Sequence, residues 1–158
     1  MTPGDNVTTA HTIRLKDLKT TAAPSLIGRV LKSLGLAGES PELTYGQAML
    51  LRIASFLHQR QTLSDRHLFN LVDTAGHLIV AAGEDLFDAF SKKERTVPSY
   101  LLQVIDMRYA AVCTAERVVY DLFTCDMIDV KEHATPLETV TYSLTKLMSS
   151  LVHIKPQE

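Results

Sequence analysis

The chain has few cysteines and no long apolar run. It has 158 residues, of which two are cysteine and none is tryptophan. Cys113 and Cys125 form no CxxC pair, so the sequence indicates neither a disulfide framework nor a paired-thiol site, and a reducing compartment is the default. No apolar run reaches the roughly 18 residues of a transmembrane helix. Because residues 1–12 are polar and lack an apolar signal core, we expect a cytoplasmic protein without a membrane partner.

The sequence also lacks the motifs of the common catalytic sites. It contains no G-x-S-x-G, no P-loop and no G-x-G-x-x-G. Cys113, Cys125, Asp126 and His133 could be imagined as metal ligands, but zinc sites place paired ligands about two to four residues apart, and these four do not follow that spacing. We therefore expect no enzymatic activity, no metal and no cofactor.

Charge is distributed unevenly along the chain. Residues 1–32 hold five basic and two acidic side chains, a net charge of +3, whereas the other 126 residues hold 11 basic and 16 acidic ones, a net charge of −5. A basic face on an acidic body is typical of a nucleic-acid-binding protein. The same five cations are also compatible with an ordinary solvated surface.

Helical periodicity dominates the first half of the chain. We expect a first helix over Leu15–Ala22 and a second that begins at Pro24, where the missing N–H costs nothing in the first turn. Gly35 is expected to follow the end of the second helix. The apolar face of that helix consists of Ile27, Val30, Leu31 and Leu34. Its outer face presents Ser25, Arg29, Lys32 and Ser33.

Two further helices are marked by capping residues. Thr44 and Gln47 have the spacing of a capping box, which opens a helix. The inner positions of this helix are Leu50, Ile53, Ala54 and Leu57. Thr62 or Ser64 caps the next helix, and Gly76 is expected to end it. The inner positions of that helix are Leu68, Leu71, Val72 and Ala75.

The second half of the chain has a mixed pattern. Residues 77–82 are compatible with a strand or with a continuing helix, and residues 85–90 look helical. Runs rich in β-branched and aromatic residues predict strands over Tyr100–Ile105, Tyr109–Cys113, Val118–Phe123 and Thr139–Leu144. A short helix over Thr145–His153 is expected to close the chain. An alternative places Leu137, Val140, Leu144, Leu147 and Leu151 on one helical seam, although two heptads are fewer than a convincing coiled coil needs.

Residues 13–73 resemble the DNA-binding domain of MerR-type regulators. The matching segments are Ile13–Leu18, Ser25–Lys32, Gly35–Leu36, Tyr45–Ala48, Leu51–Ile53 and Leu63–Asp73. The resemblance implies a first helix, a recognition helix, a wing, a helix led by tyrosine and a final short helix. The chain departs from the family at Leu26–Arg29, where the family carries a Thr-(Ile/Leu)-Arg-Tyr-Tyr-like run. It departs again at Glu39 and Glu42, because the family's wing is commonly basic.

By this resemblance, Arg29 and Lys32 would meet base edges or phosphates, and three cations before them would hold the DNA backbone. The complete expected DNA-binding set is Arg14, Lys16, Lys19, Thr20, Ser25, Arg29 and Lys32. Since a single recognition helix reads few base pairs, we expect a homodimer on paired half-sites of double-stranded DNA. The expected dimer contact is the last helix, through Leu144, Leu147, Met148 and Leu151.

The sequence thus predicts an α+β protein. A four-helix winged helix-turn-helix-like unit over residues 13–76 follows a disordered tail over 1–12. Residues 77–158 then form a small antiparallel sheet with a C-terminal helix, used for dimerisation or sensing. The predicted function is sequence-specific regulation of transcription. The alternative is a helical adaptor that regulates through a protein partner without touching DNA, which would suit the acidic wing and the overall charge of −2.

Overall fold

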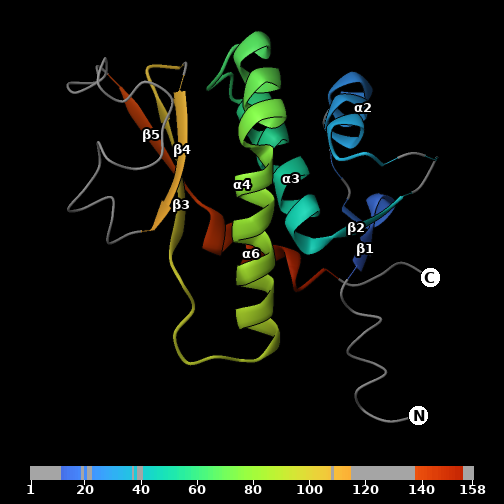
Figure 1. The fold of residues 1–158 in the computed structure, drawn as a ribbon, viewed down its shortest axis with the longest axis vertical. Coiled ribbons are helices and arrows are strands. Elements are labelled where there is room, and N and C mark those ends of the chain that lie inside the picture. The colour runs from blue at the N-terminus through green and yellow to red at the C-terminus, as the bar shows by residue number, and fades with distance from the viewer. Residues whose placement is uncertain are drawn as a thin grey trace.

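The computed structural model describes residues 12–18, 20, 23–36, 38, 41–107, 109–114 and 138–154, and over these the architecture is α+β. The elements combine four α-helices, a one-turn 3-10 helix and two small antiparallel sheets (Figure 1). In chain order they are β1 (Thr12–Arg14), η1 (Leu15–Leu18), α2 (Pro24–Ser33), β2 (Glu42–Thr44), α3 (Tyr45–Gln59), α4 (Asp65–Ser91), β3 (Tyr100–Ile105), β4 (Tyr109–Thr114), β5 (Thr139–Ser143) and α6 (Leu144–Leu151).

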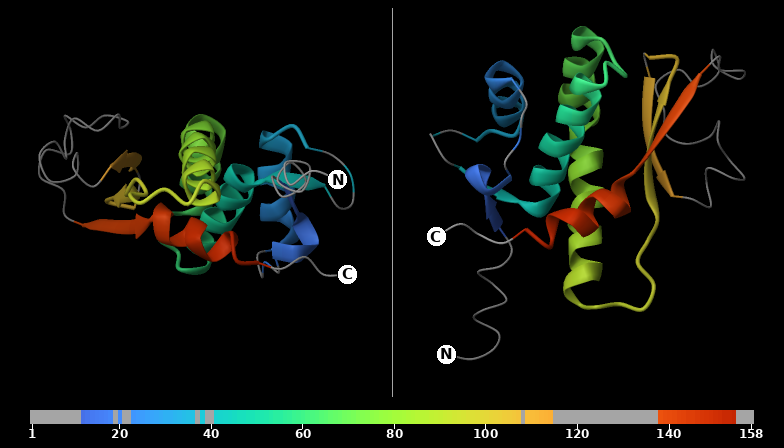
Figure 2. Two further views of the ribbon diagram at one scale, coloured as in Figure 1. Left: turned by 90° about the horizontal axis from the view of Figure 1, so that it is seen from below. Right: turned by 180° about the vertical axis from the view of Figure 1, so that it is seen from behind.

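The helices α3 and α4 lie side by side at the centre of the molecule. On one side are α2 and the β1–β2 ribbon, and on the other is the sheet of β4, β3 and β5 (Figures 1 and 2). The last helix, α6, packs across both central helices. One hydrophobic core joins these parts, because a single cluster of buried side chains extends from Ile13 to Leu151. The expected boundary between residues 76 and 77 falls inside α4.

The first segment differs from the expected helix over Leu15–Ala22. Ile13 pairs with Leu43 in the antiparallel β1–β2 ribbon, so Thr12, expected to end a disordered tail, instead begins a strand. Among the described residues of that range, 15–18 and 20, helical structure covers only the single turn of η1. The carbonyl of Leu18 accepts a hydrogen bond from Nη2 of Arg52 at 2.8 Å, so a side chain of α3 occupies the acceptor that a continuing helix would use.

Three predicted helix boundaries are confirmed in detail. The helix α2 begins at Pro24, and Gly35 follows its end with a positive φ of 71°. The amide of Leu36 donates to the carbonyl of Leu31, and that of Gly35 to the carbonyl of Lys32, which together form a Schellman motif. At the start of α3, Thr44 and Gln47 make both bonds of the capping box.

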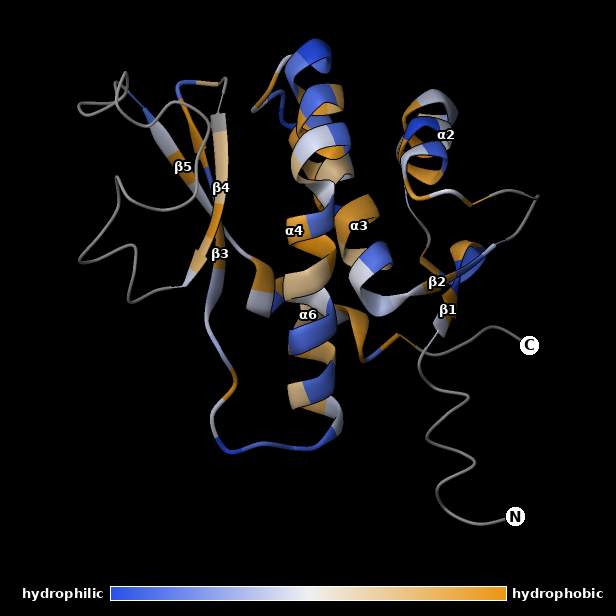
Figure 3. Ribbon diagram, viewed as in Figure 1, coloured by the Kyte–Doolittle hydropathy of each residue, from blue (hydrophilic) through white to orange (hydrophobic). Residues whose placement is uncertain are grey.

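The prediction that Gly76 ends a helix is wrong. Ser64, not Thr62, caps α4, which then continues through Gly76 to Ser91. Gly76 and Gly83 do not end the helix but allow α3 to approach α4 closely. A Cβ on Gly83 would lie 2.6 Å from the Cα of Gly46, and one on Gly76 would lie 3.2 Å from a methyl group of Leu50. In Figure 3, hydrophobic and hydrophilic bands alternate along α4, as expected for a helix with one buried face.

The second half largely follows the predicted elements. The strand β3 has the predicted bounds, and β4 is one residue longer than expected. Val140 lies in strand β5 opposite Val104, so the alternative of one helical seam through Val140 and Leu144 is wrong. The predicted strand over residues 118–123 lies outside the described residues.

Candidate nucleic-acid interface

The helix α2 is supported from one side only. Leu26 and Val30 are buried against the core, whereas the opposite face is exposed. The exposed positions are Pro24, Ser25, Gly28, Arg29, Lys32 and Ser33. A Cβ added to Gly28 would meet nothing within 4 Å, so this glycine is not required by packing within the chain. The outer face of α2 is therefore polar, partly cationic and narrow.

Arg29 is held against the first half of α4. Its Nη2 donates a hydrogen bond to Oδ2 of Asp73 at 2.8 Å, and its guanidinium carbon lies 5.4 Å from the centre of the Phe69 ring. Both ends of the ion pair remain accessible, with 45% of the Arg29 side chain and 41% of the Asp73 side chain exposed. Such a pair in contact with water contributes little to stability, but it fixes the direction of the guanidinium.

A groove of about 710 Å³ runs between α2 and α4 beside this ion pair. It is lined by Arg29, Arg66, His67, Phe69, Asn70 and Asp73. The two arginines outnumber the single carboxylate, so the groove suits an anion such as a phosphate. Sequence reasoning missed Arg66, His67 and Asn70. The spacing of 66, 70 and 73 indicates one face of a capped helix, but nothing in the sequence indicates that this face lies beside Arg29.

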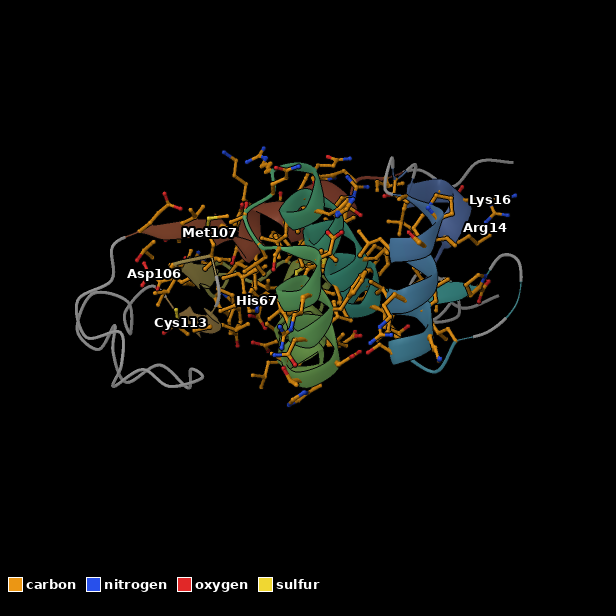
Figure 4. All side chains as sticks on the ribbon, turned by 90° about the horizontal axis from the view of Figure 1, so that it is seen from above. Arg14, Lys16, His67, Asp106, Met107 and Cys113 are labelled. Carbon is orange, nitrogen blue, oxygen red and sulfur yellow. The ribbon has the colours of Figure 1, made fainter. Side chains whose placement is uncertain are left out.

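The basic residues near β1 are in a more acidic environment. Nε of Arg14 lies 3.0 Å from Oδ2 of Asp17, whose side chain is buried, and Arg14 is also in register with Glu42 on β2. Lys16 is exposed on η1. Figure 4 shows Arg14 and Lys16 together at the α2 end of the molecule, with Asp106, Met107 and Cys113 at the opposite, sheet end. Of these two cations, Arg14 forms an ion pair with a carboxylate, and Lys16 forms none with the described residues.

The remaining expected DNA-binding residues are in different environments. The hydroxyl of Thr20 lies 3.2 Å from that of Ser55, a buried residue of α3, so Thr20 supports the fold and does not point to a free surface. Ser25 is exposed in the first turn of α2, and Lys19 lies outside the described residues. The structure thus brings Ser25, Arg29 and Lys32 onto one helix face and places Arg66 next to it.

The four expected dimer residues are mostly covered within the chain. Leu144, Met148 and Leu151 have no exposed surface, because α6 packs on α3 and α4. Leu147 is only half-buried. An apolar stripe on a helix predicts burial but does not identify what covers it, and here most of the stripe faces the chain's own core.

Other kinds of site find little support. Within the described ranges, no three His, Cys, Asp or Glu side chains are grouped so that they could hold a metal ion. Cys113 is buried in the sheet, whereas Cys125, Asp126 and His133 lie outside those ranges. No helix in the described part of the chain has both the length and the apolar character needed to cross a membrane.

Comparisons of the chain with models of protein families, with curated proteins and with solved structures return no match. The function must therefore be argued from the residues themselves.

Proposed function

We propose that the protein is a cytoplasmic, sequence-specific DNA-binding regulator of transcription that acts as a dimer, with α2 as the helix that enters the major groove. The observation that carries this proposal is the exposed face of α2, with Arg29 and Lys32 on the helix and Arg66 beside it on α4. A major groove about 12 Å wide admits a helix of this kind. The small side chains at Ser25 and Gly28 leave the helix backbone open to close approach.

The surroundings of α2 support the same assignment. A one-turn helix precedes it, the β1–β2 ribbon lies next to it, and a helix led by Tyr45 follows. In the proposed MerR-like winged helix-turn-helix, β1–β2 would act as the wing, but the order differs from that pattern, because β1 precedes the helices whereas the family's wing follows the recognition helix. The single turn of η1 in place of a full first helix is a departure from that pattern.

Each basic residue then has a separate role. Lys32 and Ser25, on the exposed face of α2, would contact base edges or phosphates. Arg29 and Arg66 would bind a backbone phosphate at the groove between α2 and α4, and Lys16 would hold the backbone at the ribbon end. Binding of a ten-residue helix to one half-site is weak, so occupancy of a regulatory site would require two copies on half-sites about one helical turn apart.

The deciding experiment is selection of genomic DNA fragments by the purified full-length protein, followed by sequencing. We expect enrichment of a palindromic site, lost in the Arg29→Ala/Lys32→Ala variant and retained in Arg95→Ala, which removes an exposed cation from the loop after α4. Circular dichroism must show that the double variant is folded, because Arg29 also contacts Asp73. If folded wild-type protein enriches nothing at low salt, the DNA proposal is wrong and the adaptor function is favoured.

A further inference from the structure

A second groove lies on the α6 side of the molecule, away from the ion pair of Arg29. It has a volume of about 380 Å³ and lies where the second half of α3 meets β5 and α6. Its lining is Ile53, Phe56, Arg60, Tyr142, Ser143, Lys146, Leu147 and Ser150. Ile53 is almost fully buried, whereas Phe56, Tyr142 and Leu147 are half-buried and keep apolar surface accessible. Tyr142 is fixed in place by a hydrogen bond between its hydroxyl and that of Thr62.

The charged side chains that line this groove, among the described residues, all have one sign. Arg60 and Lys146 are exposed at its rim, and no carboxylate of the described residues forms an ion pair with either. The sequences of α3 and α6 contain no Asp or Glu at all, although the whole chain carries a net charge of −2. The guanidinium carbon of Arg60 lies 5.5 Å from the centre of the Phe56 ring, so a cation borders the apolar wall directly.

We propose that this groove binds an acidic amphipathic helix of another protein. The helix would insert one or two apolar side chains between Phe56, Tyr142 and Leu147, and would place carboxylates against Arg60 and Lys146. A pocket of this volume is near the lower end of the size range of ligand sites and suits side-chain anchors. Recognition of an apolar helix face by a groove between helices is a recurrent mode of binding.

The same charges argue against a second copy of this chain as the occupant. In a two-fold dimer, each patch contacts its own equivalent. Arg60 and Lys146 of one copy would then approach the same cations of the other, which is unfavourable. An acidic partner meets the rim with opposite charge and covers the same apolar wall. This interaction is independent of DNA binding by α2, which lies on the far side of α3 and α4 (Figure 2).

The test uses two labelled helical peptides and full-length protein. One peptide carries leucines at i, i+4 spacing flanked by glutamates, and the other has lysine at each glutamate position. We expect fluorescence anisotropy to show about tenfold tighter binding of the glutamate peptide, since two exposed charge pairs are formed. The Arg60→Glu/Lys146→Glu variant should reverse the preference. Leu147→Ser should weaken binding of the glutamate peptide to the otherwise unchanged protein.

Two variants control for folding and for total charge. Lys146→Glu alone places a carboxylate in the first turn of α6, a position that the helix dipole favours, so it should fold and lose most of the preference. Lys93→Glu/Arg95→Glu changes the net charge as the double variant does, but in the loop after α4, and should leave both affinities unchanged. Equal binding of the two peptides, or indifference to Leu147→Ser, would overturn the proposal. So would a dimer of the protein alone that Arg60→Glu/Lys146→Glu dissociates, since the groove would then hold a second copy.

Discussion

Arg29 on α2 and Asp73 on α4 are 44 residues apart and form an ion pair of 2.8 Å across the groove between the two helices. The bond uses Nη2 of the guanidinium and leaves its other nitrogens without a partner among the described residues. An arginine held in this way is oriented before any ligand arrives, which reduces the side-chain entropy lost on binding. The carboxylate that orients it also repels an approaching phosphate.

The balance of these two effects can be measured with Asp73→Asn, which keeps an oxygen acceptor for Arg29 and removes the negative charge. We expect binding to duplex DNA to become about fivefold tighter, because one unit charge near a phosphate is worth roughly 1 kcal/mol in a water-like environment. Asp88→Asn makes the same charge change near the far end of α4 and should alter affinity much less. Weaker binding of Asp73→Asn in a titration would mean that orientation of Arg29 outweighs repulsion.

The role of Lys16 predicts a change in salt dependence. Each Lys or Arg that contacts a phosphate steepens the plot of log affinity against log salt by about 0.9. Lys16 is exposed on η1, so Lys16→Ala should make the plot shallower by about that amount without unfolding the protein. Arg95→Ala serves as the comparison. An unchanged slope for Lys16→Ala would remove Lys16 from the interface.

The parts of the fold that could be predicted are those specified by nearby residues. Pro24 and Gly35 bound α2, the Thr44–Gln47 pair opens α3, and the β-branched run at Thr139–Thr141 distinguishes a strand from a helix. Each of these signals acts within about four residues, so the sequence displays it directly.

The parts that could not be predicted depend on residues far apart in the chain. The pairing of Ile13 with Leu43 adds a strand directly before the expected first helix, of which the described residues keep only the turn of η1. The ion pair of Arg29 and the lining of its groove require α4 to lie beside α2. The sequence shows the leucine stripe of α6, but it does not show that α3 and α4 pack against this stripe. Gly76 was predicted to end a helix. In the structure it leaves room for the side chain of Leu50, which belongs to another helix, so the residues around Gly76 do not reveal its role.

The close contact of α3 with α4 at Gly83, and the open surface of α2 at Gly28, predict opposite effects for substitution of these two glycines. In Gly83→Ala the new methyl group would lie 2.6 Å from the Cα of Gly46, so the two helices must separate, and we expect a loss of about 3 kcal/mol in the free energy of unfolding. In Gly28→Ala the methyl group meets nothing within 4 Å, and the helix should gain about 1 kcal/mol. Urea unfolding followed by circular dichroism measures both. Equal effects of the two changes would contradict the close contact.

Tyr100 and Asp85 predict how stability depends on alkaline pH. The Tyr100 hydroxyl donates a hydrogen bond of 2.6 Å to Oδ2 of Asp85, and this bond, with partial burial and the nearby charge, raises the pKa of Tyr100 from 10.0 to about 12. A pKa raised in the folded state means that the stabilisation is fully present below pH 10 and is lost as the pH rises through about 12. Tyr100→Phe should therefore be less stable than wild type at neutral pH, by about 1 kcal/mol for a hydrogen bond in contact with water.

The difference between wild type and Tyr100→Phe should shrink between pH 10 and pH 12, the interval set by the two pKa values. All other groups are common to both proteins, so their effect cancels in the difference. Urea unfolding of both proteins at a series of pH values gives the curve, and the difference in tyrosinate absorbance between the two proteins follows the ionisation of Tyr100, one of five tyrosines. A constant difference over the whole interval would show that the effect does not depend on the hydroxyl proton, and would contradict the role given to the hydrogen bond with Asp85.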